Sequence, residues 1–117
     1  MMDWRTQVNA ICAELPGAEK SDPFGGGHDC WKVGGKMFAL LGAEPGVSVK
    51  TPDTETAEML RDTTDATRAP YFHRSWVRLP AGTDMDFTRH RIELSYDIIR
   101  AGLTRKAQAA LPPREER

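Results

Sequence analysis

The sequence has no marked excess of charge of either sign, almost no cysteine and no long apolar run. Its 117 residues include 16 lysines and arginines against 17 aspartates and glutamates, which gives a formal net charge of -1. This balance excludes a strongly basic domain, the usual electrostatic sign of nucleic-acid binding, but it leaves room for a local basic patch. No stretch approaches the roughly 18 consecutive apolar residues of a membrane-spanning helix, so we expect no membrane role.

The few cysteines and the first residues bear on the compartment. Cys12 and Cys30 fall on a predicted helix and a predicted strand, which favours buried, reduced thiols over a disulfide scaffold. Residues 1–7 are polar and lead directly into a helical pattern, without the apolar segment and the small-residue cleavage site of a secretory signal. We therefore expect a cytoplasmic protein.

The composition is typical of one soluble globular domain. Hydrophobic residues make up 39% of the chain, and aromatic and β-branched residues recur along most of it, which argues against disorder. A chain of this length buries one core but is too short for two. We expect a single domain over residues 1–111 and a frayed tail over residues 112–117, which holds two prolines and a charged end.

The first half of the chain predicts a helix followed by a three-stranded antiparallel meander. Apolar residues at helical spacing mark a helix over residues 3–15, with Asp3 as its cap. A loop over residues 21–27 precedes two β-prone runs, 30–33 and 36–41, and the two glycines between these runs favour a tight hairpin. A turn over residues 44–46 leads to a third strand over residues 47–50.

The second half predicts two more helices and a strand pair. Thr51 caps a helix that begins with Pro52 and ends near Arg61 or Asp62, and residues 63–69 form a loop. A strand pair follows, made of residues 71–72 and 76–79. A long last helix runs from Asp84 or Asp86 to about Ala110, and its small residues Ser95 and Gly102 permit a close approach to the sheet.

No motif in the chain predicts catalysis or metal binding. Cys30 with His28 nearby lacks an orienting third group and an anion-stabilising pocket. Residues of metal-ligand type occur without the paired spacing of a zinc site: His28, Asp29, Cys30, His73 and His90. The glycines at 25–27 precede a strand, whereas a phosphate-binding loop opens a helix. We expect a non-enzymatic protein without a catalytic residue, cofactor or metal.

Basic and aromatic residues alternate through the predicted strands and their loops. The basic residues are Lys32, Lys36, Lys50, Arg68, Arg74 and Arg78, and the aromatic ones are Trp31, Phe38, Tyr71, Phe72 and Trp76. Cations bind phosphates and exposed rings stack on bases, so one interpretation is a nucleic-acid surface. In the other interpretation the rings point into the core and the cations simply face water, as in any antiparallel sheet with one solvated face.

Several segments resemble the MmcQ/YjbR family of small bacterial proteins. They are Asp22-Pro23-Phe24-Gly25, residues 31–39, Val49-Lys50, residues 76–79 and residues 95–103, in the order of the family. The resemblance implies an α+β domain with a CyaY-like arrangement, in which an antiparallel sheet packs against N- and C-terminal helices. It also implies DNA binding through a double wing of hairpins. The segment before Trp76 carries fewer polar donors than in many relatives.

Two functional hypotheses follow from these observations. In the first, the chain binds double-stranded DNA mainly through phosphate contacts from the six basic residues, and the turns at Gly34-Gly35 and around His73-Arg74 are the wings. In the second, a cleft between sheet and helices, rimmed by Trp31, Phe72 and Trp76, holds a peptide or a metabolite. A contiguous positive face favours the first hypothesis, and an apolar pocket with scattered cations favours the second. The oligomeric state stays open.

Overall fold

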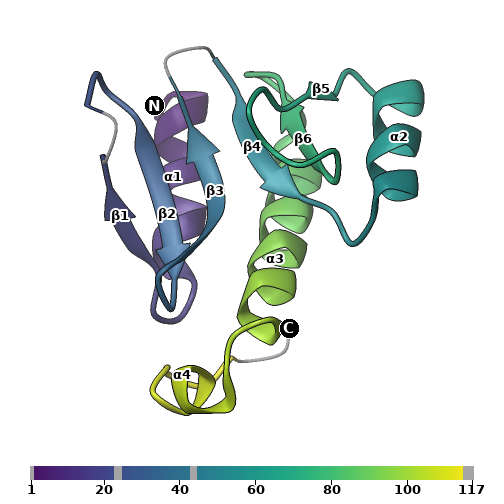
Figure 1. The fold of residues 1–117 in the computed structure, drawn as a ribbon. Helices are drawn as coiled ribbons and strands as arrows, with labels where there is room; N and C mark the ends of the chain where they lie inside the picture. Colours follow the sequence, from purple (N-terminus) through teal and green to yellow (C-terminus); the bar gives the residue numbers. More distant parts are fainter. Residues whose placement is uncertain (1, 23–24, 43–44, 115–117) are drawn as a thin grey trace.

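The computed structural model describes residues 2–22, 25–42 and 45–114. In them a six-stranded antiparallel sheet packs against helices from both ends of the chain, which confirms the expected α+β class (Figure 1). The helices are α1 (Trp4–Glu14), α2 (Thr54–Thr63), α3 (Met85–Ala101) and α4 (Arg105–Ala109). The strands are β1 (Glu19–Ser21), β2 (Asp29–Val33), β3 (Lys36–Leu41), β4 (Val47–Lys50), β5 (Thr67–Arg68) and β6 (Trp76–Leu79). Of the segments named above, Pro23, Phe24, Glu44 and residues 115–117 lie outside the described residues.

The strands follow the order β1-β2-β3-β4-β6-β5, so the predicted β2-β3-β4 meander forms the middle of the sheet. Gly34 and Gly35 join β2 to β3 with φ of 57° and 81°. Two positive φ values define the primed turn that the sequence predicts. Strand β1 was not predicted, because its three residues are all exposed and show no apolar alternation.

Helices α1 and α3 cover one face of the sheet (Figure 1). Asp3 caps α1 as expected, and Val8, Ile11 and Cys12 turn its apolar side into the core. In α3 the buried apolar side chains are Ile92 and Tyr96, whose ring meets the edge of Phe38 at 5.4 Å between ring centroids. None of the helices among the described residues has the length and apolar content needed to cross a membrane.

The structure corrects the sequence prediction around α2. Its cap is Asp53, whose side chain accepts a hydrogen bond from the Thr56 N–H. Thr51 is buried instead, and its hydroxyl lies within hydrogen-bond distance of the Asp53 and Ser75 carbonyls. Residues 71–72 are not a strand. Strand β6 pairs with β4 on one side and, on the other, with β5, which lies inside the segment predicted as loop.

The predicted last helix is two helices. Gly102 ends α3, and the Thr104 side chain caps α4 by accepting a hydrogen bond from the Ala107 N–H. Beyond α4 the chain turns back onto α3: Arg100 donates to the Pro112 carbonyl at 2.8 Å, and Arg114 forms a 2.9 Å ion pair with Asp97. Pro112 and Arg114 therefore contact α3.

Candidate binding face of the sheet

The face of the sheet opposite α1 and α3 carries mixed basic and apolar side chains. Trp31 donates its indole N–H to Asn9 of α1, so Trp31 and its cross-strand partner Ala39 lie on the helix side. Because side chains alternate along a strand and paired residues share a face, the other residues are assigned by register. We call this surface the open face; it contains Cys30, Lys32, Met37, Leu40, Ser48, Lys50, Trp76 and Arg78.

The connection between β5 and β6 passes over this open face (Figure 1). Phe72 in the connection stacks on Trp76 of β6, with ring centroids 4.3 Å apart and planes 19° apart. Tyr71 next to it is fully exposed, at 106% of the reference accessibility. We call Tyr71, Phe72 and Trp76 the aromatic ledge.

A hollow lies between the aromatic ledge and the strands. It has a volume of about 470 Å³ and is lined by His28, Met37, Leu40, Pro70, Tyr71 and Phe72. A second hollow of about 290 Å³ shares most of these residues and extends to Ser48 and Arg78. Side chains from β3, β4 and β6 and from the connection thus surround one shallow, mainly apolar depression.

Hydrogen bonds hold the connection in place at its β6 end. The Ser75 carbonyl accepts from the backbone N–H of Thr51 at 2.8 Å and from the Thr51 hydroxyl at 2.7 Å. Lys50 Nζ donates to Ser75 Oγ at 2.8 Å, and His73 Nδ1 accepts from the Ser75 N–H at 3.1 Å. Ser75 itself is buried. Its hydroxyl therefore positions the connection and is not placed to attack a substrate.

The structure brings three of the six predicted basic residues together. Lys32, Lys50 and Arg78 lie on the open face, on β2, β4 and β6. Lys36 pairs with Val33, and Arg68 pairs with Val77. Both valines are on the helix side of the sheet by register, so Lys36, beside the β2–β3 turn, and Arg68, on edge strand β5, belong to that side too. Arg74 is exposed in the connection. The six residues therefore do not form a single ridge, but half of them share one face.

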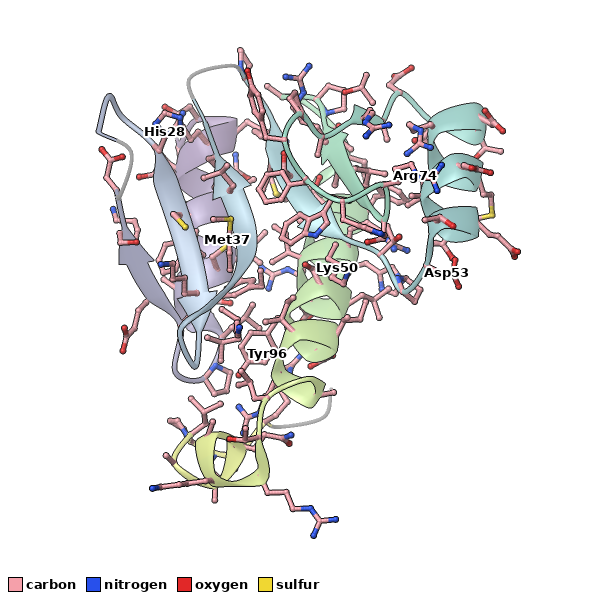
Figure 2. The ribbon with its side chains drawn as sticks, in the orientation of Figure 1. His28, Met37, Lys50, Asp53, Arg74 and Tyr96 are labelled. Carbon is pink, nitrogen blue, oxygen red and sulfur yellow. The ribbon has the colours of Figure 1, made fainter. Side chains whose placement is uncertain are left out.

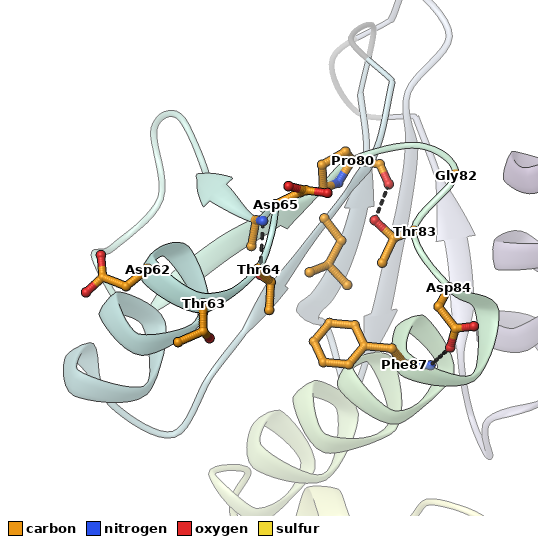
Figure 3. A pocket seen from close by; sticks show the side chains of 11 residues that line it. Asp62, Thr63, Thr64, Asp65, Pro80, Gly82, Thr83, Asp84 and Phe87 are labelled. Carbon is orange, nitrogen blue, oxygen red and sulfur yellow. Dashed lines mark hydrogen bonds between the residues drawn. The ribbon is translucent and has the colours of Figure 1, made fainter.

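Acidic residues are concentrated elsewhere in the described part of the chain. A separate hollow of about 520 Å³ near the end of α2 is bordered by the carboxylates of Asp62, Asp65 and Asp84 (Figure 3). Asp84 there caps α3 by accepting a 3.0 Å hydrogen bond from the Phe87 N–H. Among the described strand residues, Glu19 is the one acid that the register places on the open face. The three carboxylates thus gather at this hollow, whereas Lys32, Lys50 and Arg78 lie on the open face.

The cysteines lie as the sequence predicts, whereas the tryptophans do not. Cys12 and Cys30 are free and buried, and burial raises the pKa of both thiols, which makes them poor nucleophiles at neutral pH. The described residues contain no cluster of three metal-ligating side chains. Trp31 lies on the face opposite to Phe72 and Trp76, so the cleft that these three rings were expected to rim does not form.

Comparison with known proteins gives a family match and a structural match. Residues 13–98 match the family model described as YjbR. The crystal structure of the Deinococcus radiodurans protein DR2400, assigned to the domain family DUF419, superimposes with a TM-score of 0.81. It is 21% identical in sequence, and the match covers 92% of this chain and 87% of that chain, which shows a shared fold. No curated protein matches the chain.

Proposed function

Because the chain belongs to the YjbR family, whose members are described as DNA-binding, we propose that it binds DNA by placing the phosphate backbone on the open face of its sheet. The observation that carries this proposal is that Lys32, Lys50 and Arg78 share this face. Neighbouring strands are about 4.8 Å apart, so Lys32 and Lys50 lie roughly 10 Å apart across the sheet. Several phosphates of one strand can therefore be contacted together. The proposal is of a binding protein, not an enzyme.

The distribution of charge supports this proposal despite the net charge of -1. Acidic residues gather on α2 and its two flanks, at Asp53, Glu55, Glu58, Asp62 and Asp65. They are five of the 17 acidic residues of the chain. Among the described strand residues, the acid that the register assigns to the open face is Glu19 on edge strand β1, the cross-strand partner of Lys32. A polyanion approaching the protein is thus repelled at α2 and attracted at the open face.

The connection between β5 and β6 supplies a further cation at the border of this surface. Arg74 is exposed there, one residue before buried Ser75, which fixes the end of the connection. The turn at Gly34-Gly35, which joins β2 to β3, lies at the lower end of these strands in Figure 1, away from the connection between β5 and β6. We propose that these two connections act as the two wings, that the three cations of the open face make the phosphate contacts, and that Arg74 lies at their border.

Titration of a fluorescently labelled DNA duplex at several salt concentrations tests the proposal. With about three phosphate contacts, the logarithm of the association constant falls against the logarithm of salt concentration with a slope of about -3. Fluorescence anisotropy measures both the affinity and the slope. Absence of binding at low salt to the duplex and also to its separated strands contradicts the proposal, and binding without salt dependence contradicts the role of the three cations.

A second candidate function rests on the hollow beside the aromatic ledge. Its volume of about 470 Å³ falls in the range of small-molecule sites, roughly 300–1,000 Å³. We propose as the alternative that it holds a small aromatic ligand and that the chain has no nucleic-acid role. Indole is a suitable neutral probe, and the methyl NMR signals of Met37 and Leu40 report its entry. Shifted methyl signals in a protein that fails to bind DNA favour this alternative.

A further inference from the structure

We propose that the aromatic ledge stacks on unpaired bases, so that the chain binds single-stranded DNA more tightly than duplex DNA. This inference rests on the proposed function and identifies the form of the DNA. Its first support is the backbone at Tyr71. Ala69-Pro70-Tyr71-Phe72 forms a turn closed by the hydrogen bond from the Phe72 N–H to the Ala69 carbonyl, and Tyr71 has a φ of 69°. Proline in second position and positive φ in third position are the marks of a type II turn.

The third position of such a turn favours glycine, because a side chain strains the backbone there. Among the described residues, Tyr71 is the one residue other than glycine with positive φ. Its ring gains nothing from burial to offset this strain, because it is fully exposed. A strained backbone that presents a large exposed ring is typical of a binding position, because the ring is retained for contacts that form outside the protein.

The second support is the geometry of the rings. Phe72 is half-buried and rests on buried Trp76, so one flat aromatic surface is already held in a fixed orientation. Tyr71 and Phe72 border the hollow on one side, and Met37 and Leu40 border it on the other. A planar base enters such a space face-on against a ring. Bases of a duplex present only their edges to a protein, so an unpaired base is required.

The third support is the position of the cations relative to the ledge. Lys50 is the cross-strand partner of Trp76, and Arg78 lines the hollow that adjoins Tyr71 and Phe72 (Figure 2 shows Lys50 and Met37). A base that stacks on the ledge thus brings its own phosphate close to Lys50 or Arg78. Aromatic rings beside a basic groove form the usual arrangement of proteins that bind single strands without reading their sequence.

The test compares three labelled ligands of equal length at the same low salt concentration: a single strand, its duplex, and an abasic strand that keeps the phosphates but lacks the bases. We expect the single strand to bind about tenfold more tightly than the abasic strand, and more tightly than the duplex. Tyr71→Ala is expected to weaken single-strand binding about tenfold and to leave duplex binding and the salt slope unchanged.

Two further variants keep the result interpretable. Phe72→Leu retains an apolar side chain over Trp76 but removes the stacking ring, and it is expected to act like Tyr71→Ala. Met59→Ala removes another exposed apolar side chain, on α2, and is expected to change nothing. Equal affinity for the single strand and the abasic strand, or weakening of duplex binding by Tyr71→Ala, overturns the inference and leaves the proposed function standing. Failure of all three ligands to bind overturns the proposed function itself.

Discussion

Ser95 of α3 donates its hydroxyl proton to the carbonyl of Phe38 in β3 at 2.6 Å. Phe38 is the extra residue of a bulge in β3. The neighbouring residues Trp31 and Lys32 of β2 pair with Ala39 and Met37, so Phe38 between them has no partner residue on β2. The same hydroxyl accepts the backbone N–H of Lys50 in β4 at 2.9 Å. One helical hydroxyl thus joins the two strands beside the bulge and connects α3 to the sheet at the position that carries Lys50.

Replacement of this hydroxyl is expected to destabilise the fold. In Ser95→Ala the Phe38 carbonyl and the Lys50 N–H both lose their partner, and the loss of such hydrogen bonds in a buried site costs about 1–3 kcal/mol. Urea unfolding followed by circular dichroism measures the change as a lower midpoint with an unchanged slope. His90→Ala, at an exposed position of the same helix, is the control. A loss below about 0.5 kcal/mol in Ser95→Ala contradicts the bridging role.

The local elements of the fold were predictable where short-range chemistry determines them. A tight primed turn needs positive φ at both of its central residues, and glycine adopts positive φ readily. The two glycines between β2 and β3 therefore predicted the hairpin, and both have positive φ. Residues 71–72 gave a misleading strand signal, since aromatic residues fit the half-buried surface of a sheet whether they lie in a strand or fold over it from a loop. Strand β5 consists of the two exposed residues Thr67 and Arg68, which leave no periodic pattern to detect.

The candidate site was only half predictable because it depends on register between distant strands. Lys50 and Arg78 share a face because β4 pairs with β6 across α2 and β5, a long-range pairing that periodicity does not reveal. The bulge at Phe38 adds one residue to β3, so the residues before it lie on the opposite face of the sheet from the one that simple alternation predicts. Lys36 therefore lies on the helix side. The aromatic ledge had a signal, Pro70 before two aromatic residues, that was interpreted as a strand.

Asp29 is expected to make the fold sensitive to acid. Burial raises the pKa of this carboxyl, but hydrogen bonds from Asn9 and Arg5 and the charges of Arg5 and Lys20 outweigh burial, so the pKa lies below its usual value. A pKa that is lower in the folded than in the unfolded chain gives stability that is present above the unfolded value of about 3.9 and is lost as the pH falls through the folded value.

The measurement is the melting temperature as a function of pH in the wild type and in Asp29→Asn. The wild type is expected to lose stability below about pH 4. The variant is expected to be less stable at neutral pH, because it no longer pairs with Arg5 at 3.0 Å, and to show a shallower decline in acid. Asp86→Asn, at an exposed position in the first turn of α3, serves as the control. Parallel curves for the wild type and Asp29→Asn exclude Asp29 as the source.

The cations of the open face are expected to differ from those of the helix side in their effect on DNA binding. Lys32→Gln and Arg78→Gln each remove one phosphate contact, so each is expected to weaken binding to any sequence and to reduce the magnitude of the salt slope by about one. Lys36→Gln and Arg68→Gln remove the same charge from exposed positions on the other side of the sheet. Anisotropy titrations of all four variants decide the question. Equal losses in both pairs indicate an effect of net charge alone and contradict a site on the open face.

Tyr71 is expected to separate stability from binding. Glycine adopts a φ of 69° freely, whereas a residue with a Cβ atom costs roughly 1–2 kcal/mol in the left-handed region, part of which the greater freedom of unfolded glycine cancels. Tyr71→Gly is therefore expected to be more stable than Tyr71→Ala by about 1 kcal/mol in urea unfolding. Both variants lose the ring, so both are expected to lose the same single-strand affinity. If Tyr71→Gly gains no stability over Tyr71→Ala, the backbone is not strained at this position. If either variant retains wild-type affinity for single strands, the ring is not a stacking surface.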